Sequence, residues 1–373
     1  MHRFLHTSDL HLGKRFGNLP EDIRGRLREA RHVVLSRLAT EARTAGATAI
    51  LIAGDMFDTE TPTPALMRQA LGEMASHGDI AWVILPGNHD SLLADALWSV
   101  MGHNLPDNVT VALEAVPLEI VPGMVILPAP CTVRRPGRDL TDWMDAATSG
   151  EDIVRIGLAH GAIQSFGEEG AQDIIAPDRA KRAGLDYLAL GDWHGQMSID
   201  PRTWYSGTPE PDRFKHGQPG RALLVTIPGP GVQPDVNPVD TGSFDWMTLA
   251  LDFLGEEDAE AMLRERLPAA RRRQTLLRIV ASGRLRIGQR SDLENVVVAV
   301  APEFGHLEFR TENLASLCEA EDLDMIDKGG ALRQAAEMLR AESADTLRSA
   351  QERAVAADAM NRLFAISREV EAL

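Results

Sequence analysis

Side chains that commonly ligate metal ions follow three short apolar runs near the start of the chain, and this placement constrains the fold more than any other feature. The runs and the motifs after them are Arg3-Phe4-Leu5 before Asp9-Leu10-His11, Ala49–Ala53 before Gly54-Asp55-Met56-Phe57-Asp58, and Ala81–Leu85 before Gly87-Asn88-His89-Asp90. Short apolar runs are typical of buried strands, and the carboxyl ends of parallel strands share one edge of a sheet. The sequence therefore predicts a site along the edge of a parallel sheet.

Helical patterns separate these runs. Apolar residues recur at three- and four-residue steps over 21–45, where Gly46 ends the pattern, and again over 63–77. This alternation predicts parallel strands with helical crossovers, and the fold class is α/β. Further strands are expected at 109–113, 118–121, 124–127, 153–159, 187–190 and 221–227. Pro and Gly residues among the first three of these favour a second, more antiparallel sheet.

The amino-acid composition changes after the strand at 221–227. Residues 228–243 are rich in Pro and Gly, which is typical of a linker. Strand and helix patterns alternate over 244–315 and predict a small α/β capping domain after a first domain at 1–240. Residues 328–373 are expected to form C-terminal helices with no obvious core of their own. Their apolar stripe comprises Leu332, Leu339, Leu347, Leu363 and Val370.

The charge balance limits how the protein could bind nucleic acid. Its 373 residues include 38 Lys and Arg against 55 Asp and Glu, a formal charge of −17. Phosphate contacts need positive charge, so nucleic acid is not gripped over the whole surface, although a local basic patch or a partner could hold DNA. Cys131 and Cys318 lack ligand spacing and fit thiols of a reducing compartment. The sequence has no apolar stretch long enough to span a bilayer and no signal-peptide core. We therefore expect a cytoplasmic protein without membrane contact.

Seven candidate metal ligands stand at the ends of five predicted strands. They are Asp9, His11, Asp55, Asn88, His160, Asp192 and His194. Two divalent cations about 3.5–4 Å apart activate water and clamp the attacking and leaving oxygens of a phosphate, and they need carboxylates and imidazoles around them. Each element has a plainer interpretation: an Asp-x-His pair occurs by chance, Gly-Asp and Gly-Asn are common turns, and a loop histidine is often satisfied by hydrogen bonds. Their joint occurrence in this order favours the metal site.

These motifs resemble those of the calcineurin-like metallophosphoesterases. The longer string Leu5–Gly13 is similar to the start of the SbcD-type DNA repair exonucleases. The resemblance covers roughly residues 1–227 by motif. It implies a sandwich of two mixed β-sheets flanked by helices, with 1–240 as the nuclease domain.

The resemblance also implies a role for each residue of the site. The first metal would be held by Asp9, His11 and His194, the bridge would be Asp55, and the second metal would be held by Asn88, His160 and Asp192. His89 would be the catalytic histidine, which stabilises the transition state or protonates the leaving oxygen. Asp90 would either orient His89 or cap the following helix, and the cap is the favoured interpretation.

Asp192 departs from the family pattern. The closing motif is usually Gly-His-x-His, whereas this chain has Gly191-Asp192-Trp193-His194. A third anionic ligand makes the second site richer in oxygen, so we expect Mn²⁺, or else Mg²⁺, rather than Zn²⁺, and a less acidic water. The plainer interpretation is that Asp192 does not ligate and that the second metal binds weakly.

The resemblance implies partners as well as a substrate. DNA would be the substrate, and the C-terminal helices would dock an SMC-like ATPase of the SbcC type. A homodimer is a further expectation. No GxxxxGK[ST] loop is present, so any ATP chemistry would belong to another chain.

Several basic and aromatic residues have two interpretations. The arginines of 244–315 fit either a capping domain that contacts DNA phosphates or a solvated helix face. The arginines of the first helix are expected at the surface: Arg24, Arg26, Arg28 and Arg31. Trp193, Trp204 and Tyr205 would pack the loops near the site, or less favourably stack on a base.

Two rival functions remain open. One is a small-molecule phosphodiesterase or phosphatase, against which the N-terminal string, the capping unit and the C-terminal helices argue. The other is a non-catalytic scaffold subunit with one impaired metal site, against which the presence of His89 argues.

Overall fold

The structure is a computed structural model that describes residues 1–163, 175–255, 257–327 and 329–371. The chain divides into two compact units, Met1–Asp245 and Trp246–Leu373. Parts of the predicted domains lie outside the described residues: 164–174 of the 1–240 domain, 256 of the capping domain, and 328, 372 and 373 of the C-terminal helices. The three-part division at 1–240, 244–315 and 328–373 therefore stays a prediction.

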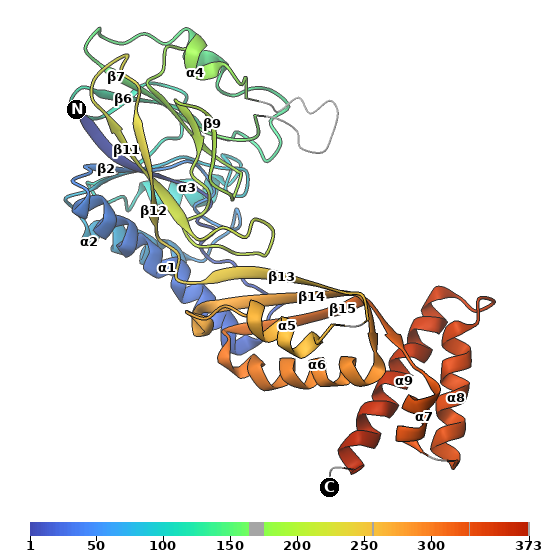
Figure 1. Ribbon diagram of the computed structural model, residues 1–373. Helices are drawn as coiled ribbons and strands as arrows, with labels where there is room; N and C mark the ends of the chain where they lie inside the picture. Colours follow the sequence, from blue (N-terminus) through green and yellow to red (C-terminus); the bar gives the residue numbers. More distant parts are fainter. Residues whose placement is uncertain (164–174, 256, 328, 372–373) are drawn as a thin grey trace. The chain divides into compact units, whose positions relative to one another are not determined.

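Two six-stranded mixed sheets form the first unit (Figure 1). The first has the order β12-β11-β1-β2-β3-β4 and comprises β1 (His2–Thr7), β2 (Ala49–Ile52), β3 (Ala81–Ile84), β4 (Val109–Val111), β11 (Arg221–Ile227) and β12 (Asp235–Asp240). The second has the order β5-β6-β7-β8-β10-β9 and comprises β5 (Leu118–Val121), β6 (Met124–Ala129), β7 (Val154–His160), β8 (Tyr187–Gly191), β9 (Met197–Asp200) and β10 (Thr203–Tyr205). The predicted α/β sandwich of two mixed sheets flanked by helices is confirmed.

Strand alternation distributes the apolar side chains between a central core and two outer ones. Phe4 and Leu51 lie between the sheets with Ile156 of β7. Their neighbours Leu5 and Ile50 point to the other face of the first sheet, which is covered by α1 (Glu21–Thr44), α2 (Pro64–Ser76) and α3 (Asp95–Gly102) (Figure 1). The outer face of the second sheet packs against η1 (Asp142–Asp145) and α4 (Arg179–Arg182). Helices cover both sheets, and the strand ends form the site.

The second sheet is not more antiparallel than the first, so that prediction is wrong. β6, β7, β8 and β10 run parallel, and only the edge strands β5 and β9 run antiparallel to their neighbours. The first sheet has the same balance, with β1 to β4 parallel and β11 and β12 antiparallel. The long connections on either side of β7 allow the chain to return to the same sheet edge, as parallel pairing requires. The Pro and Gly residues after β4 marked only the antiparallel pair β5 and β6.

The predicted linker over 228–243 is wrong in its second half. Residues 235–240 form β12, which pairs antiparallel with β11, and Pro238 lies opposite Leu223. β12 is the edge strand of its sheet, and no further strand pairs with its outer side. A proline, which has no backbone N–H to donate, is tolerated in such a strand. Its Pro-rich composition is therefore compatible with strand structure.

The second unit contains a three-stranded sheet and helical segments among the described residues. The sheet comprises β13 (Asp245–Phe253), β14 (Thr275–Arg286) and β15 (His306–Leu317), in that order. The helical segments with it are α5 (Ala259–Arg266), η2 (Arg272–Gln274), α6 (Ile287–Val300) and η3 (Ala301–Glu303). They are followed by α7 (Ala320–Ile326), α8 (Ala331–Ala344) and α9 (Ala350–Glu371), and α7 was not predicted.

The C-terminal helices have a small core, contrary to the sequence prediction. Leu323 and Ile326 of α7 pack with Ala336 of α8, with Met360 and Phe364 of α9, and with Ile287 at the start of α6. Much of the predicted stripe is exposed instead, with Leu332, Leu347 and Val370 at 49%, 95% and 66%. The other two stripe residues, Leu339 and Leu363, pack against this core.

Five of the arginines between residues 264 and 290 form ion pairs with glutamates. The pairs are Arg264–Glu260, Arg272–Glu303, Arg278–Glu308, Arg286–Glu319 and Arg290–Glu294. Because these guanidinium groups already have acidic partners, the solvated interpretation is favoured over direct contact with DNA phosphates.

Arg31 is buried, so its predicted surface position is wrong. It reaches from α1 into the first unit with 1% of its surface exposed. It donates hydrogen bonds to the carbonyl of Leu10 and, at 2.9 Å, to that of Glu210, and lies 3.8 Å from the Asp212 carboxylate. The loops after β1 and β10 are thereby held together. Helical spacing alone does not reveal this, because both loops are remote in sequence.

Replacing Arg31 with Met should therefore destabilise the protein far more than the same change on the outside of the helix. Arg31→Met leaves two carbonyls and the buried Asp212 carboxylate without their partner, and we expect a loss of about 3–5 kcal/mol in the free energy of unfolding. Arg28→Met, at an exposed position of α1 beside Glu21, should change it by less than about 0.5 kcal/mol. Urea denaturation of both variants measures the difference. Equal effects would contradict the bridging role of Arg31.

Candidate metal centre

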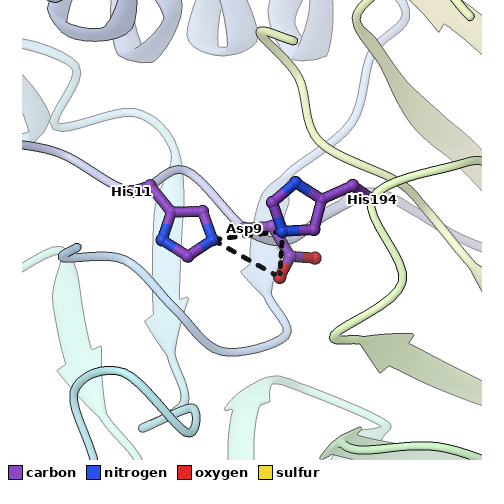
Figure 2. A group of neighbouring side chains, drawn as sticks. All are labelled: Asp9, His11 and His194. Carbon is purple, nitrogen blue, oxygen red and sulfur yellow. Dashed lines mark hydrogen bonds and ion pairs between the residues drawn. The ribbon is translucent and has the colours of Figure 1, made fainter. Parts of the chain in front are cut away.

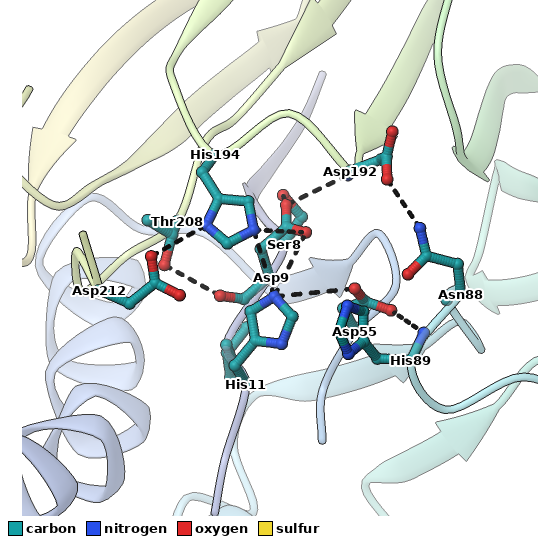
Figure 3. A network of polar contacts seen from close by, with 12 residues as sticks. Ser8, Asp9, His11, Asp55, Asn88, His89, Asp192, His194, Thr208 and Asp212 are labelled. Carbon is teal, nitrogen blue, oxygen red and sulfur yellow. Dashed lines mark hydrogen bonds and ion pairs between the residues drawn. The ribbon is translucent and has the colours of Figure 1, made fainter. Parts of the chain in front are cut away.

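The carboxyl ends of five strands from the two sheets meet at one place in the first unit (Figure 3). Asp9 follows β1, Asp55 follows β2 and Asn88 follows β3. His160 ends β7, and Asp192 follows β8. The Nδ1 atom of His160 donates a hydrogen bond of 2.8 Å to the carbonyl of Ala53, which ties the second sheet to the first. The structure thus brings together all seven candidate ligands.

Three glycines allow this close approach. A Cβ atom at Gly54 would lie 2.2 Å from His160 Nδ1, and one at Gly87 would lie 2.1 Å from Asp55 Oδ1. At Gly191 it would lie 1.9 Å from the carbonyl oxygen of Ala53. Each glycine immediately precedes a candidate ligand, so the Gly-Asp and Gly-Asn pairs of the sequence are packing requirements of the site.

Asp9, His11 and His194 form the first group of candidate ligands (Figure 2). The two Nε2 atoms lie 3.2 Å apart, and Asp9 Oδ1 lies 4.0 Å from that of His11 and 3.8 Å from that of His194. Two imidazole nitrogens and one carboxylate oxygen face a common point. Such a set suits a divalent transition-metal ion.

Two further carboxylates orient these imidazoles, and the sequence analysis assigned a role to neither. Asp212 Oδ1 lies 3.4 Å from His194 Nδ1 (Figure 3). Asp58 Oδ1 lies 3.2 Å from His11 Nδ1. A carboxylate at Nδ1 fixes the ring and turns Nε2 toward the metal. Asp58 stands in the quoted GDMFD motif and could have been found there. Asp212 lies in a loop with no local signal.

Asp9, Asp55 and His160 form a second group that shares Asp9 with the first. Asp55 Oδ2 lies 3.5 Å from His160 Nε2 and 3.7 Å from His11 Nε2, so this oxygen stands between the two groups. Such a position suits a bridging carboxylate. His11, Asp58 and His89 form a third group at one side.

Asn88 and Asp192 complete the second group (Figure 3). Asn88 Nδ2 donates a hydrogen bond of 2.8 Å to Asp192 Oδ1, which itself lies 3.8 Å from His160 Nε2. Because the Asn88 amide nitrogen is engaged by Asp192, its carbonyl oxygen is directed elsewhere. Burial raises the pKa of Asp192, and the nearby His160 opposes this. The carboxylate therefore serves at least to orient the Asn88 amide.

The donor atoms fit divalent cations. Asp9 Oδ1, Asn88 Oδ1 and His160 Nε2 are buried and have no hydrogen-bond partner among the described residues. Burial alone would raise the pKa of Asp55, but His160 holds it well below the ordinary value, and Asp55 in turn raises that of His160. A proton on His160 thus supplies the positive charge that Asp55 needs. A cation bound here would replace that proton.

The ligand loops store backbone strain. Asp9, His11, Asp55 and Asp192 have positive φ angles of 54°, 44°, 54° and 93°. Residues other than glycine seldom adopt this region, at a cost of order 1–3 kcal/mol each, and such residues cluster at functional sites. The fold holds these four side chains in place against a local preference.

His89 lies at the edge of the group. Its backbone nitrogen donates a hydrogen bond of 2.8 Å to Asp55 Oδ1, and its Nδ1 lies 3.1 Å from the carbonyl oxygen of Asp58. A carbonyl only accepts, so Nδ1 carries the proton and Nε2 points away from Asp58. The His89 ring meets that of His11 edge to face at 4.9 Å between centroids.

Asp90 does not cap a helix, so the favoured prediction is wrong. Its side chain is fully buried and accepts hydrogen bonds from the backbone nitrogens of Gly87, at 2.7 Å, and Phe57, at 2.9 Å. The next helix, α3, begins at Asp95. Asp90 joins the loops after β2 and β3, an interaction between segments that local capping rules do not anticipate.

The packing interpretation holds for all three aromatic residues, since Trp193 also packs against the core on the outer face of the second sheet. Trp204 and Tyr205 belong to β10, whereas the sequence had suggested a loop. Trp204 packs against the core between the sheets, and Tyr205 against the core on the outer face of the second sheet.

Cys131 and Cys318 are free thiols, in agreement with the sequence. None of the helices in the described ranges has the length and apolar character needed to cross a membrane.

Comparison with known proteins identifies a family and several relatives of this chain. Residues 2–196 match the family model of the calcineurin-like phosphoesterases. The chain is 28% identical over 244 residues to the uncharacterized metallophosphoesterase YhaO of Bacillus subtilis, an alignment that covers 61% of this chain and 58% of that protein. It is 24% identical over 276 residues to the DNA double-strand break repair protein Mre11 of Methanosarcina acetivorans, with 68% and 41% covered.

A shorter segment is more similar to a third relative, which belongs to the SbcCD nuclease of Bacillus subtilis. Over 93 residues the chain is 40% identical to this nuclease component, with 24% of this chain and 22% of that protein covered. The alignments span less than two thirds of the length of each of these three relatives.

Asp212 offers a direct test of how the first group is oriented. Asp212→Asn should weaken Mn²⁺ binding about 10- to 100-fold, because an amide no longer fixes His194 as a carboxylate does. Asp240→Asn, at an exposed edge of β12, is the matched control and should bind Mn²⁺ as the wild type does. Isothermal titration calorimetry measures both affinities, and circular dichroism confirms the fold. Reduced stability with unchanged affinity would mean that Asp212 serves only as the ion partner of Arg31 and Lys14.

Proposed function

We propose, from the premise that this chain belongs to the calcineurin-like phosphoesterase family, that it is the nuclease subunit of a DNA repair complex and hydrolyses phosphodiester bonds. The proposal rests on seven ligand-type side chains that meet at one place. Several of their metal-donor atoms are buried and have no hydrogen-bond partner among the described residues. The coarser statement, that the protein is a metal-dependent phosphoesterase, rests on the family itself. The finer one is supported by its similarity to proteins named as part of the SbcCD nuclease and as Mre11.

Two divalent cations would occupy the centre. Asp9, His11 and His194 would hold the first, and Asn88, His160 and Asp192 the second, with Asp55 between them. When bound, such a pair lowers the pKa of the attacking water and stabilises charge on the phosphate oxygens. The chain itself supplies orientation: Asp58 and Asp212 hold two imidazoles, and Ala53 holds the third through its carbonyl.

His89 would act on the leaving group. The Asp58 carbonyl fixes Nδ1 as the protonated atom, so Nε2 is the atom that faces substrate. A protonated Nε2 would donate its proton to the oxygen that leaves phosphorus, and a neutral one could not.

The net charge of the chain agrees best with a DNA substrate that an SMC-like ATPase partner helps to bind. At −17 the chain has an excess of negative charge, and five of the arginines between residues 264 and 290 are paired with glutamates. A partner would then supply much of the grip on DNA. Exposed apolar side chains on α8 and α9 offer it a docking surface, notably Met338 and Val355 at 65% and 63% exposure.

Nuclease assays on end-labelled single- and double-stranded DNA test the function. Wild-type protein should cleave with Mn²⁺ and not in EDTA, and His89→Ala should reduce cleavage about 10²- to 10⁴-fold. His103→Ala, at the exposed end of α3, is the matched control and should retain full activity.

The same reactions separate the rival functions. Cleavage that survives His89→Ala would mean that another group protonates the leaving oxygen. Hydrolysis of bis-p-nitrophenyl phosphate without cleavage of DNA would favour a small-molecule phosphodiesterase. Absence of both activities, even with an SMC-like ATPase added, would favour the scaffold, and cleavage that such an ATPase leaves unchanged would remove it as a partner.

Asp192 should determine the metal preference. Asp192→His removes one negative charge from the second site, so we expect a shift from Mn²⁺ toward Zn²⁺ and a more acidic attacking water. The pH–rate profile with bis-p-nitrophenyl phosphate should then rise at lower pH than in the wild type. Asp107→His, in an exposed loop, is the control. An unchanged profile and metal preference would show that Asp192 acts only through Asn88.

A further inference from the structure

A cavity of about 290 Å³ lies beside the candidate metal centre. Asp192, one of the seven candidate ligands, is also part of its wall, so the two sites adjoin. The volume is just below the roughly 300–1,000 Å³ usual for ligand pockets. It suits a single flat ring system rather than a larger molecule.

The walls of the cavity are mainly apolar. Met197 and Ile199 stand two residues apart on β9 and so face the same side, and Tyr205 pairs with Met197 in the ladder. The Tyr205 hydroxyl accepts a hydrogen bond of 2.9 Å from the nitrogen of Ile163 and donates one of 2.8 Å to the carbonyl of Gly161. With this hydroxyl satisfied, the tyrosine presents its ring to the cavity.

A lysine lies over one aromatic wall of the cavity. Trp193 lines the cavity, and Lys215 Nζ lies 5.3 Å from the centre of its ring. The His216 ring lies 4.8 Å from that of Trp193, and Arg213, which is paired with Asp212, approaches His194 Nε2 to 3.5 Å. Aromatic surface combined with cations is typical of sites that bind single-stranded nucleic acid, where bases stack and phosphates pair with the cations.

We propose that this cavity receives one unpaired nucleobase of the strand whose phosphodiester lies at the metal centre. The inference rests on the proposed nuclease function and adds a substrate class to it. A base within a duplex is stacked and paired, so it must leave the helix before it can enter. Single strands and frayed duplex ends are therefore the substrates that the cavity selects.

An abasic scan on wild-type protein tests this directly. A series of end-labelled single-stranded oligonucleotides carries one tetrahydrofuran abasic residue, at a different position in each. With Mn²⁺, cleavage at the phosphodiester next to the abasic residue should fall about tenfold, because base stacking on the cavity wall is lost. A duplex with a mismatched end should also be cut faster than the same duplex with a paired end.

Filling the cavity should mimic the missing base. Ile199→Trp places an indole in the space, so it should slow cleavage of the unmodified strand to the abasic rate and leave cleavage at the abasic position unchanged. Val116→Trp, exposed in the β4–β5 connection, is the matched control and should retain the tenfold difference. If Ile199→Trp does not fold by circular dichroism, the scan on wild-type protein decides alone.

The outcomes separate this inference from the function on which it rests. Equal cleavage at intact and abasic positions would overturn the base-binding cavity and leave the nuclease proposal standing. Hydrolysis of bis-p-nitrophenyl phosphate with no cleavage of any oligonucleotide would overturn both.

Discussion

The buried carboxylates of Asp9 and Asp55 lie within 4.8 Å of each other, with the part-exposed carboxylate of Asp192 beside His160, and much of the first unit is arranged around this concentration of negative charge. Like charges so close together and so deeply buried need compensation, and burial raises the cost of leaving them without it. Imidazoles from both sheets provide part of it, and the raised pKa of His160, which Asp55 causes, keeps a compensating proton on that ring. The remaining unsatisfied atoms explain why this fold is suited to cations.

Basic side chains lie around the acidic centre and compensate its charge. Lys14 Nζ lies 3.3 Å from Asp58 and 2.9 Å from Asp212, the two carboxylates that orient His11 and His194. One lysine thus couples both orienting groups. Further out, Arg31 connects the loops that carry the site to α1. Acidic and basic residues alternate outward from the centre, which keeps the imidazoles in a single arrangement while the buried charges remain paired.

Sequence reasoning succeeded where the information was local. A buried strand and the ligand after it occupy about ten residues, so Asp9, Asp55 and Asn88 could be assigned to strand ends directly. It failed where partners are remote in sequence: the burial of Arg31 and the position of Asp212 depend on loops that meet only in the folded chain. Asp90 joins two loops for the same reason, although its sequence context favoured a helix cap.

The positive φ angles at Asp9, Asp55 and Asp192 have an evolutionary consequence. Among side chains, asparagine tolerates this backbone region almost as well as aspartate, and glycine adopts it without strain. A change to Asn or Gly at these positions would therefore remove a charge while the loop keeps its shape. Most other residues would disturb the loop as well. Relatives that have lost catalysis yet kept the sandwich should carry Asn or Gly at the positions of Asp9 and Asp55, so that loss of the activity leaves a recognisable pattern in the sequence.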